Sequence, residues 1–203
     1  MKIGILVGSH RQGSQSAKIG GFLAREIEQL SSHSVWTLDL GITPLPLWDE
    51  QIGSDAPHWD MWQQVREELI DCHAFIVVTP EWHGMVPAAL KNFFLICGGS
   101  GELAHKPALI CSVSAGIGGS FPVNELRTSS YKNSRLCYIP EHLIIRNCMS
   151  VMNANAAENT GEEHDYLVDR ARYALQQLFA YGEALVNVRA SGTTSLEAFP
   201  NGM

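Results

Sequence analysis

Residues 80–84 bring several chemically useful groups together on one short loop. The sequence there is Pro-Glu-Trp-His-Gly, so a carboxylate, an indole and an imidazole are followed by a glycine. A carboxylate beside an imidazole can do general acid–base chemistry, and an indole can pack on a flat ring. The plainer interpretation, which we favour, is that Glu81 and His83 only form hydrogen bonds with the loop backbone.

Two further loops are rich in glycine and serine. Residues 8–16 read Gly-Ser-His-Arg-Gln-Gly-Ser-Gln-Ser, and residues 112–120 read Ser-Val-Ser-Ala-Gly-Ile-Gly-Gly-Ser. The N–H groups at the start of the helix expected after the first loop favour an anion, and Arg11 adds positive charge. The first loop fits neither a dinucleotide nor a triphosphate pattern, so a monophosphate suits it better. A helix capped by Ser14 or Ser16, with no ligand, is the alternative. Glycines in the second loop would let a flat ligand approach the backbone.

All three loops follow short apolar runs, which predict buried strands. Strands are expected at residues 2–7, 35–40, 74–78, 108–113 and 143–145. Helices are expected at about residues 16–30, 56–70, 85–96, 121–132 and 161–188. This alternation predicts an α/β fold with a doubly wound, five-stranded parallel sheet. We expect the strand order 2-1-3-4-5, in which strands one, three and four are neighbours. The loops after strands one, three and four then meet at one edge, where such sheets bind ligands.

Composition and charge limit the class of protein. The chain has 203 residues, 45% of them hydrophobic and 17% charged, and this predicts one folded domain over residues 1–190 with a loose tail over 191–203. The net charge of −7 argues against a nucleic-acid or anionic-membrane partner, and no apolar run is long enough to span a bilayer. The five cysteines are widely spaced without a C-x-x-C pair, so we expect no metal site and reduced thiols in a cytoplasmic protein, with Cys111 in the core.

The segment 43–50 reads Thr-Pro-Leu-Pro-Leu-Trp-Asp-Glu, and its prolines exclude regular structure. Its apolar side chains still need cover, either from simple packing on the protein surface or from a partner. The following helix adds Trp59 and Trp62, and not all these side chains can turn inward at once. We therefore expect at least a homodimer, with Trp48 in or beside the interface.

Three motifs together resemble the NADPH-dependent FMN reductase family, a flavodoxin-like group, over about residues 2–145. They are Gly8-Ser9-x-Arg11-x-Gly13-Ser14, the segment Pro80-Glu-Trp-His-Gly-x-Val-Pro-Ala-Ala-Leu-Lys-Asn92, and Ser114-x-Gly116-x-x-Gly119. The second is similar to the family's Pro-Glu-Tyr-Asn-Gly-x-(Ile/Val)-Pro-Gly-x-Leu-Lys-Asn. This chain departs from that pattern at Trp82, His83 and Ala88. The segment Leu45–Glu50 also resembles the family's connection between the second strand and the second helix.

The resemblance implies an enzyme that uses NADPH or NADH to reduce FMN and then a small electron acceptor such as a quinone. It implies no catalytic side chain, because the flavin accepts the hydride, and it implies dimers or tetramers. The phosphate would be held by Ser9, Arg11, Ser14 and Ser16. The loop formed by Pro80, Glu81, Trp82, His83 and Gly84 would support the isoalloxazine ring through its backbone N–H groups, and the loop containing Ser114, Gly116 and Gly119 would lie on the ring's other side. The alternative is an FMN-binding electron carrier or redox sensor without its own NAD(P)H turnover.

Overall fold

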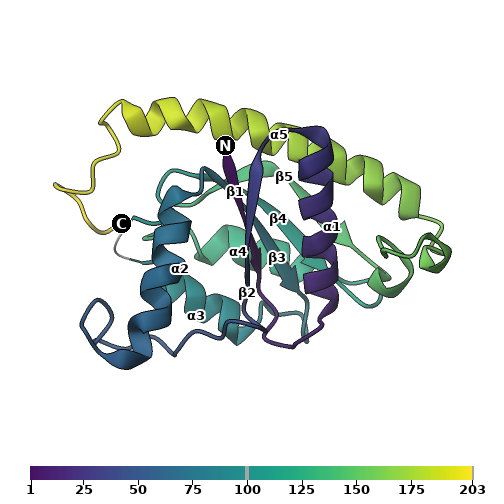
Figure 1. The fold of residues 1–203 in the computed structure, drawn as a ribbon, viewed down its shortest axis with the longest axis horizontal. Helices are drawn as coiled ribbons and strands as arrows, with labels where there is room; N and C mark the ends of the chain where they lie inside the picture. The colour runs from purple at the N-terminus through teal and green to yellow at the C-terminus, as the bar shows by residue number, and fades with distance from the viewer. Residues whose placement is uncertain (99–100, 203) are drawn as a thin grey trace.

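The computed structural model describes residues 1–98 and 101–202. Within that range the chain forms a parallel sheet with the strand order β2-β1-β3-β4-β5, flanked by helices (Figure 1). The strands are β1 (Lys2–Val7), β2 (Ser34–Asp39), β3 (Ala74–Pro80), β4 (Pro107–Val113) and β5 (Cys137–Ile145). The predicted fold class and strand order are confirmed.

The helices cover both faces of the sheet. They are α1 (Gln15–Leu30), α2 (Asp60–Asp71), α3 (Ala88–Ile96), α4 (Ser120–Ser129) and α5 (His164–Ala190). Helices α1 and α5 pack on one face, and α2, α3 and α4 pack on the other (Figure 1). Right-handed crossovers between parallel strands require this two-sided arrangement. No helix in the described part of the chain is both long enough and apolar enough to cross a membrane.

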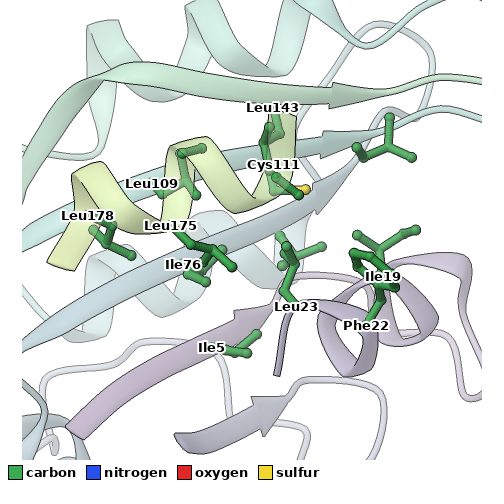
Figure 2. Packing of buried hydrophobic residues seen from close by; sticks show 14 of the residues in the cluster. Ile5, Ile19, Phe22, Leu23, Ile76, Leu109, Cys111, Leu143, Leu175 and Leu178 are labelled. Atoms are coloured by element: carbon green, nitrogen blue, oxygen red, sulfur yellow. The ribbon is translucent and has the colours of Figure 1, made fainter. Parts of the chain in front are cut away.

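The core has two halves because side chains alternate across the central strands. Ile5 on β1 and Ile76 on β3 face α1 and α5, whereas Leu6 and Val77, one residue further along, face α2 and α3. Figure 2 shows the first half, where strand residues meet Leu23 of α1 and leucines of α5. Every residue of β3 and β4 is buried, which accounts for their continuous apolar runs.

Several element boundaries differ from those expected. Strand β5 begins at Cys137, six residues earlier than predicted, because this edge strand carries an exposed Pro140 and an irregular register that break its apolar pattern. Helix α3 begins at Ala88, three residues later than predicted, because Pro87 is its N-cap and a tight turn precedes it. Helix α2 begins at Asp60, after a short 3₁₀ turn.

Two large side chains on α2 and α5 lie outside the core. Ile70 is 50% exposed, because it follows the buried Leu69 and adjacent helical residues point about 100° apart. Tyr181 is 40% exposed, because the buried stripe of α5 passes through its neighbour Gly182, which packs against Met1.

The cysteines are all unpaired, and Cys111 is fully buried in β4. Burial raises the pKa of the Cys111 thiol to about 12, so it behaves as a core residue as predicted. In the C-terminal segment, the carbonyl groups of Phe199 and Pro200 accept hydrogen bonds from Arg135 at 2.8 and 2.9 Å.

Candidate functional site

The loop after β1 is held between two other parts of the chain. Gly8 donates its N–H to Val78 O at 2.8 Å, and a Cβ on Gly8 would come within 2.6 Å of Leu90. On the other side, a Cβ on Gly41 would lie 2.6 Å from the carbonyl oxygen of Arg11. Glycine at both positions therefore lets the loop fit closely against α3 and the segment that follows β2.

The first turn of α1 is suited to an anion. Ser14 is the N-cap, and its Oγ accepts the N–H of Ala17 at 3.1 Å, as the capping interpretation predicted. Ser16 is 1% exposed, and its hydroxyl has no hydrogen-bond partner among the described residues. Because an unpaired buried hydroxyl is costly, it fits a site that a ligand completes. Ser9 is also buried, and Arg11 is exposed beside it.

The starts of the other two helices near this edge are closed by carboxylates. Glu125 Oε2 accepts the N–H of Val86, just before α3, at 2.8 Å. Glu81 Oε2 accepts the N–H of Gly119, the N-cap of α4, at 2.5 Å. None of the three helices has an acidic residue in its first turn, and among the described residues no carboxylate accepts an N–H at the start of α1. Among these three helix starts, α1 is therefore the one that can accept a phosphate.

Residues 82–85 form a two-residue turn. Trp82 and Met85 exchange two backbone hydrogen bonds, of 3.1 and 2.9 Å. The central residues, His83 and Gly84, have φ values of 52° and 73°. Asn and His tolerate a positive φ better than most residues do, so the family's Asn and this chain's His83 satisfy the same backbone demand.

The backbone donors of this loop are fewer than expected. Glu81 gives its N–H to the last carbonyl of β4 at 3.0 Å, the N–H of Trp82 is used in the turn, and Pro80 has none. Of the residues in this loop, only His83 and Gly84 have backbone N–H groups without a partner among the described residues, so these two can bind a ligand. The prediction that this loop supports a ring through its N–H groups therefore depends on these two donors. The side chain of Glu81 accepts a backbone N–H, as the plainer interpretation expects, whereas the His83 imidazole forms no hydrogen bond with the described residues.

The loop after β4 is shaped by its glycines. Gly119 has a φ of 105°, and a Cβ there would meet Ile144 at 2.5 Å. Ser114 Oγ accepts the N–H of Gly116 at 3.3 Å, and Arg146 donates to Gly118 O at 3.0 Å. The structure thus brings all three predicted loops to the carboxyl edge of β1, β3 and β4.

The sequence did not single out the aromatic contacts between these loops. The rings of His10 and Trp82 meet edge to face, with centroids 4.8 Å apart and planes at 87°. Phe121 is 66% exposed, and its ring lies 3.8 Å from where a Cβ of Gly84 would be. His10 occupies a variable position of its motif, so no signal marked it. Phe121 directly follows the third loop, and this position in the sequence could have marked it as a residue near the site.

Two surface hollows lie away from these loops. One of about 460 Å³ lies between α3 and α4, and one of about 640 Å³ lies beside Trp48. We place the candidate site at the loops because the unpaired Ser16 hydroxyl and the open start of α1 provide recognition chemistry there.

The sheet order, with a glycine- and serine-rich loop after its first strand, defines a flavodoxin-like α/β protein. Residues 1–149 match the NADPH-dependent FMN reductase family, and the chain belongs to that family. This confirms the resemblance seen in the three motifs.

Individual relatives are more distant. A quinone reductase from Pseudomonas putida is 33% identical over 125 residues, which are 60% of this chain and 64% of that protein. The match thus spans less than two thirds of that relative. A 2-hydroxy-1,4-benzoquinone reductase from Burkholderia is 28% identical over 172 residues, 82% of this chain and 90% of the other.

Solved structures show the same fold. An oxidoreductase from Corynebacterium diphtheriae superposes with a TM-score of 0.69 at 15% identity, covering 89% of this chain and 95% of that one. A flavoenzyme NAD(P)H:(acceptor) oxidoreductase from Paracoccus denitrificans superposes with a TM-score of 0.66 at 18% identity. The match covers 92% of this chain and 97% of that one.

Proposed function

We propose that the chain binds FMN and acts as an NAD(P)H-dependent flavin or quinone reductase. The observation that carries this proposal is the open start of α1, where the buried Ser16 hydroxyl has no partner among the described residues. Family membership supports the flavin, and the relatives named quinone reductases support a small quinone as the acceptor.

The phosphate of FMN would bind at the loop after β1. Ser9, Ser14 and Ser16 supply hydroxyl donors, α1 supplies the positive end of its dipole, and Arg11 supplies a guanidinium. Ser14 accepts the N–H of Ala17 through its oxygen, so its own hydroxyl proton stays free to donate.

The ring would lie between the 82–85 turn and the loop after β4. His83 and Gly84 offer N–H groups to its polar edge, and Trp82 offers an aromatic wall. Apart from its chain neighbours, no described residue has a heavy atom within 4 Å of the Cβ position of Gly116, which leaves room for a flat group. The hydride and electron chemistry would be supplied by FMN when it is bound, so the chain needs no acid–base residue of its own. The chain must hold the ring and leave one face open to the nicotinamide and the acceptor in turn, which implies ping-pong kinetics.

Two measurements test this proposal. Titration with FMN should change the tryptophan fluorescence, because Trp82 borders the site. Anaerobic stopped-flow with NADPH and with NADH should then bleach the flavin absorbance. No fluorescence change at high micromolar FMN would contradict FMN binding. Tight FMN binding without reduction by either nicotinamide would favour an electron carrier or redox sensor instead.

A further inference from the structure

Glu81 reaches from the end of β3 across to the loop before α4. Its Oε2 accepts the N–H of Gly119 at 2.5 Å. Its Oε1 lies only 2.6 Å from the position that a Cβ on Gly118 would take, so the carboxylate fits there because residue 118 is glycine. The carboxylate therefore packs directly over the Gly118–Gly119 backbone.

Both ends of this contact are fixed. The backbone of Glu81 extends the pairing of β3 with β4 through its bond to Val113 O. Gly119 is the N-cap of α4, where a negative charge meets the positive end of the helix dipole. Arg146 holds the other side of the loop through Gly118 O. A short charge-assisted hydrogen bond between two anchored segments sets the distance between them.

A second contact joins the same two segments. The Phe121 ring, in the first turn of α4, lies 3.8 Å from the Cβ position of Gly84 in the 82–85 turn. Phe121 can turn about its side-chain bonds, whereas the Glu81 contact ends on backbone. The carboxylate is thus the more rigid of the two connections.

We propose that Glu81 is a positioning residue for the flavin ring: its carboxylate fixes the spacing between the 82–85 turn and the loop at residues 114–119. This inference rests on the proposed FMN site. The same bond closes the start of α4 to anions and leaves α1 for the phosphate. Loss of the carboxylate should therefore weaken binding of the ring itself, whether or not the ligand carries a phosphate.

The test compares FMN with riboflavin, which lacks the phosphate, at a temperature well below the melting point of every variant. Glu81→Ala should weaken the binding of both ligands by about the same factor, roughly 10-fold, the scale of one lost charge-assisted hydrogen bond. Glu81→Gln keeps an oxygen that can accept the Gly119 N–H but loses the charge, so it should weaken binding less than Glu81→Ala does. Gly118→Ala pushes a methyl group against the carboxylate and should reproduce the loss seen with Glu81→Ala. The control is Glu28→Ala, an exposed carboxylate on α1, which should change neither affinity.

Three outcomes would overturn the inference. If Glu81→Ala melts earlier but binds riboflavin as wild type does, Glu81 only caps α4, and the proposed FMN function still stands. If Glu81→Gln is as weak as Glu81→Ala, the hydrogen bond is not the positioning element. If the wild-type chain binds neither ligand, the proposed function fails as well, which separates that result from the first two.

Discussion

The side chain of Asn92 holds the backbone on both sides of Leu47. Asn92 Oδ1 accepts the N–H of Trp48 at 2.8 Å, and Asn92 Nδ2 donates to Pro46 O at 2.8 Å. Asn92 is 7% exposed and lies on α3, at the end of the motif that begins with Pro80. Asn92 thus anchors the proline-rich segment, which lies outside the helices and strands and lacks their regular backbone hydrogen bonds.

Asn92→Ala should destabilise the protein through that anchor. It leaves the Trp48 N–H and the Pro46 carbonyl without their partner, and we expect the free energy of unfolding to fall by about 1–3 kcal/mol. Urea denaturation would measure the loss. Asn124→Ala, on the exposed side of α4, is the matched control and should be close to neutral. A neutral Asn92→Ala would mean that the segment needs no anchor.

Arg11→Ala should weaken FMN and spare riboflavin. The guanidinium is the side-chain cation of the phosphate loop, and its loss should reduce FMN affinity by about 1.5–3 kcal/mol. Fluorescence titration with both ligands measures the difference, and Arg25→Ala, exposed further along α1, is the control. An equal loss of affinity for FMN and riboflavin would show that Arg11 does not contact the phosphate.

Gly41→Ala should disturb the phosphate loop from behind. The new methyl group would lie 2.6 Å from Arg11 O and 2.9 Å from Arg11 C, and these are backbone atoms that cannot swing aside. We expect FMN affinity to drop together with stability. Gly21→Ala on α1 meets only the end of Arg25 at 3.8 Å, and it should stabilise the helix by about 0.5–1 kcal/mol. Unchanged FMN binding in Gly41→Ala would show that the loop can shift at no cost to the site.

Local patterns were enough to predict most of the fold. The runs that became β3 and β4 are apolar throughout because both faces are covered, and the glycine and serine loops mark the strand ends that meet at the site. The alternation of strands and helices indicated a doubly wound parallel sheet, and the order 2-1-3-4-5 was expected because it makes the three loop-bearing strands neighbours. The start of β5 was missed because an edge strand with Pro140 carries little apolar signal.

Contacts between distant segments could not be predicted in the same way. The His10–Trp82 pair and the Glu81–Gly119 bond each join two loops that are far apart in the sequence. The residue spacing within one loop does not indicate which residue of another loop it will contact. Nor does the sequence show that the N–H groups of His83 and Gly84 are free. That depends on which N–H groups of the loop bind to neighbouring strands and turns in the fold.

Lys106 should make stability depend on pH. Its Nζ donates to Leu69 O and Ile70 O at 2.7 and 2.8 Å, and burial lowers the pKa of Lys106 from 10.5 to about 8. Between these two values the unfolded chain binds more protons, so the free energy of unfolding gains about 3 kcal/mol as the pH rises through this window.

Denaturation of wild type and Lys106→Met at several pH values tests this effect. Buried thiols such as Cys72, whose pKa burial raises to about 12, act in the opposite direction above pH 9. The informative quantity is therefore the difference between the two proteins, which should grow in favour of wild type from pH 8 upward. A difference that stays constant with pH would contradict the depressed pKa.

Trp48 remains the candidate for a contact between two copies of the chain. Trp59 and Trp62 turn inward, at 0% and 2% exposed, so the apolar side chains left outside belong to the segment before them. Leu47 is 80% exposed and Trp48 is 46% exposed, and Trp48 borders the 640 Å³ hollow. An apolar patch of this kind, beside a hollow on the same surface, suits a self-complementary two-fold contact.

Trp48→Asp should therefore shift the molecular mass toward the monomer, because it places an unpaired charge in the contact. Sedimentation equilibrium over micromolar concentrations measures this shift, and FMN titration of the same samples should show weaker binding, since the segment beside Trp48 leads back through Gly41 to the phosphate loop. Met61→Asp, at another exposed apolar side chain on α2, is the control and should leave the mass unchanged. A wild-type mass of 22.3 kDa at every concentration would end the idea of a homodimer.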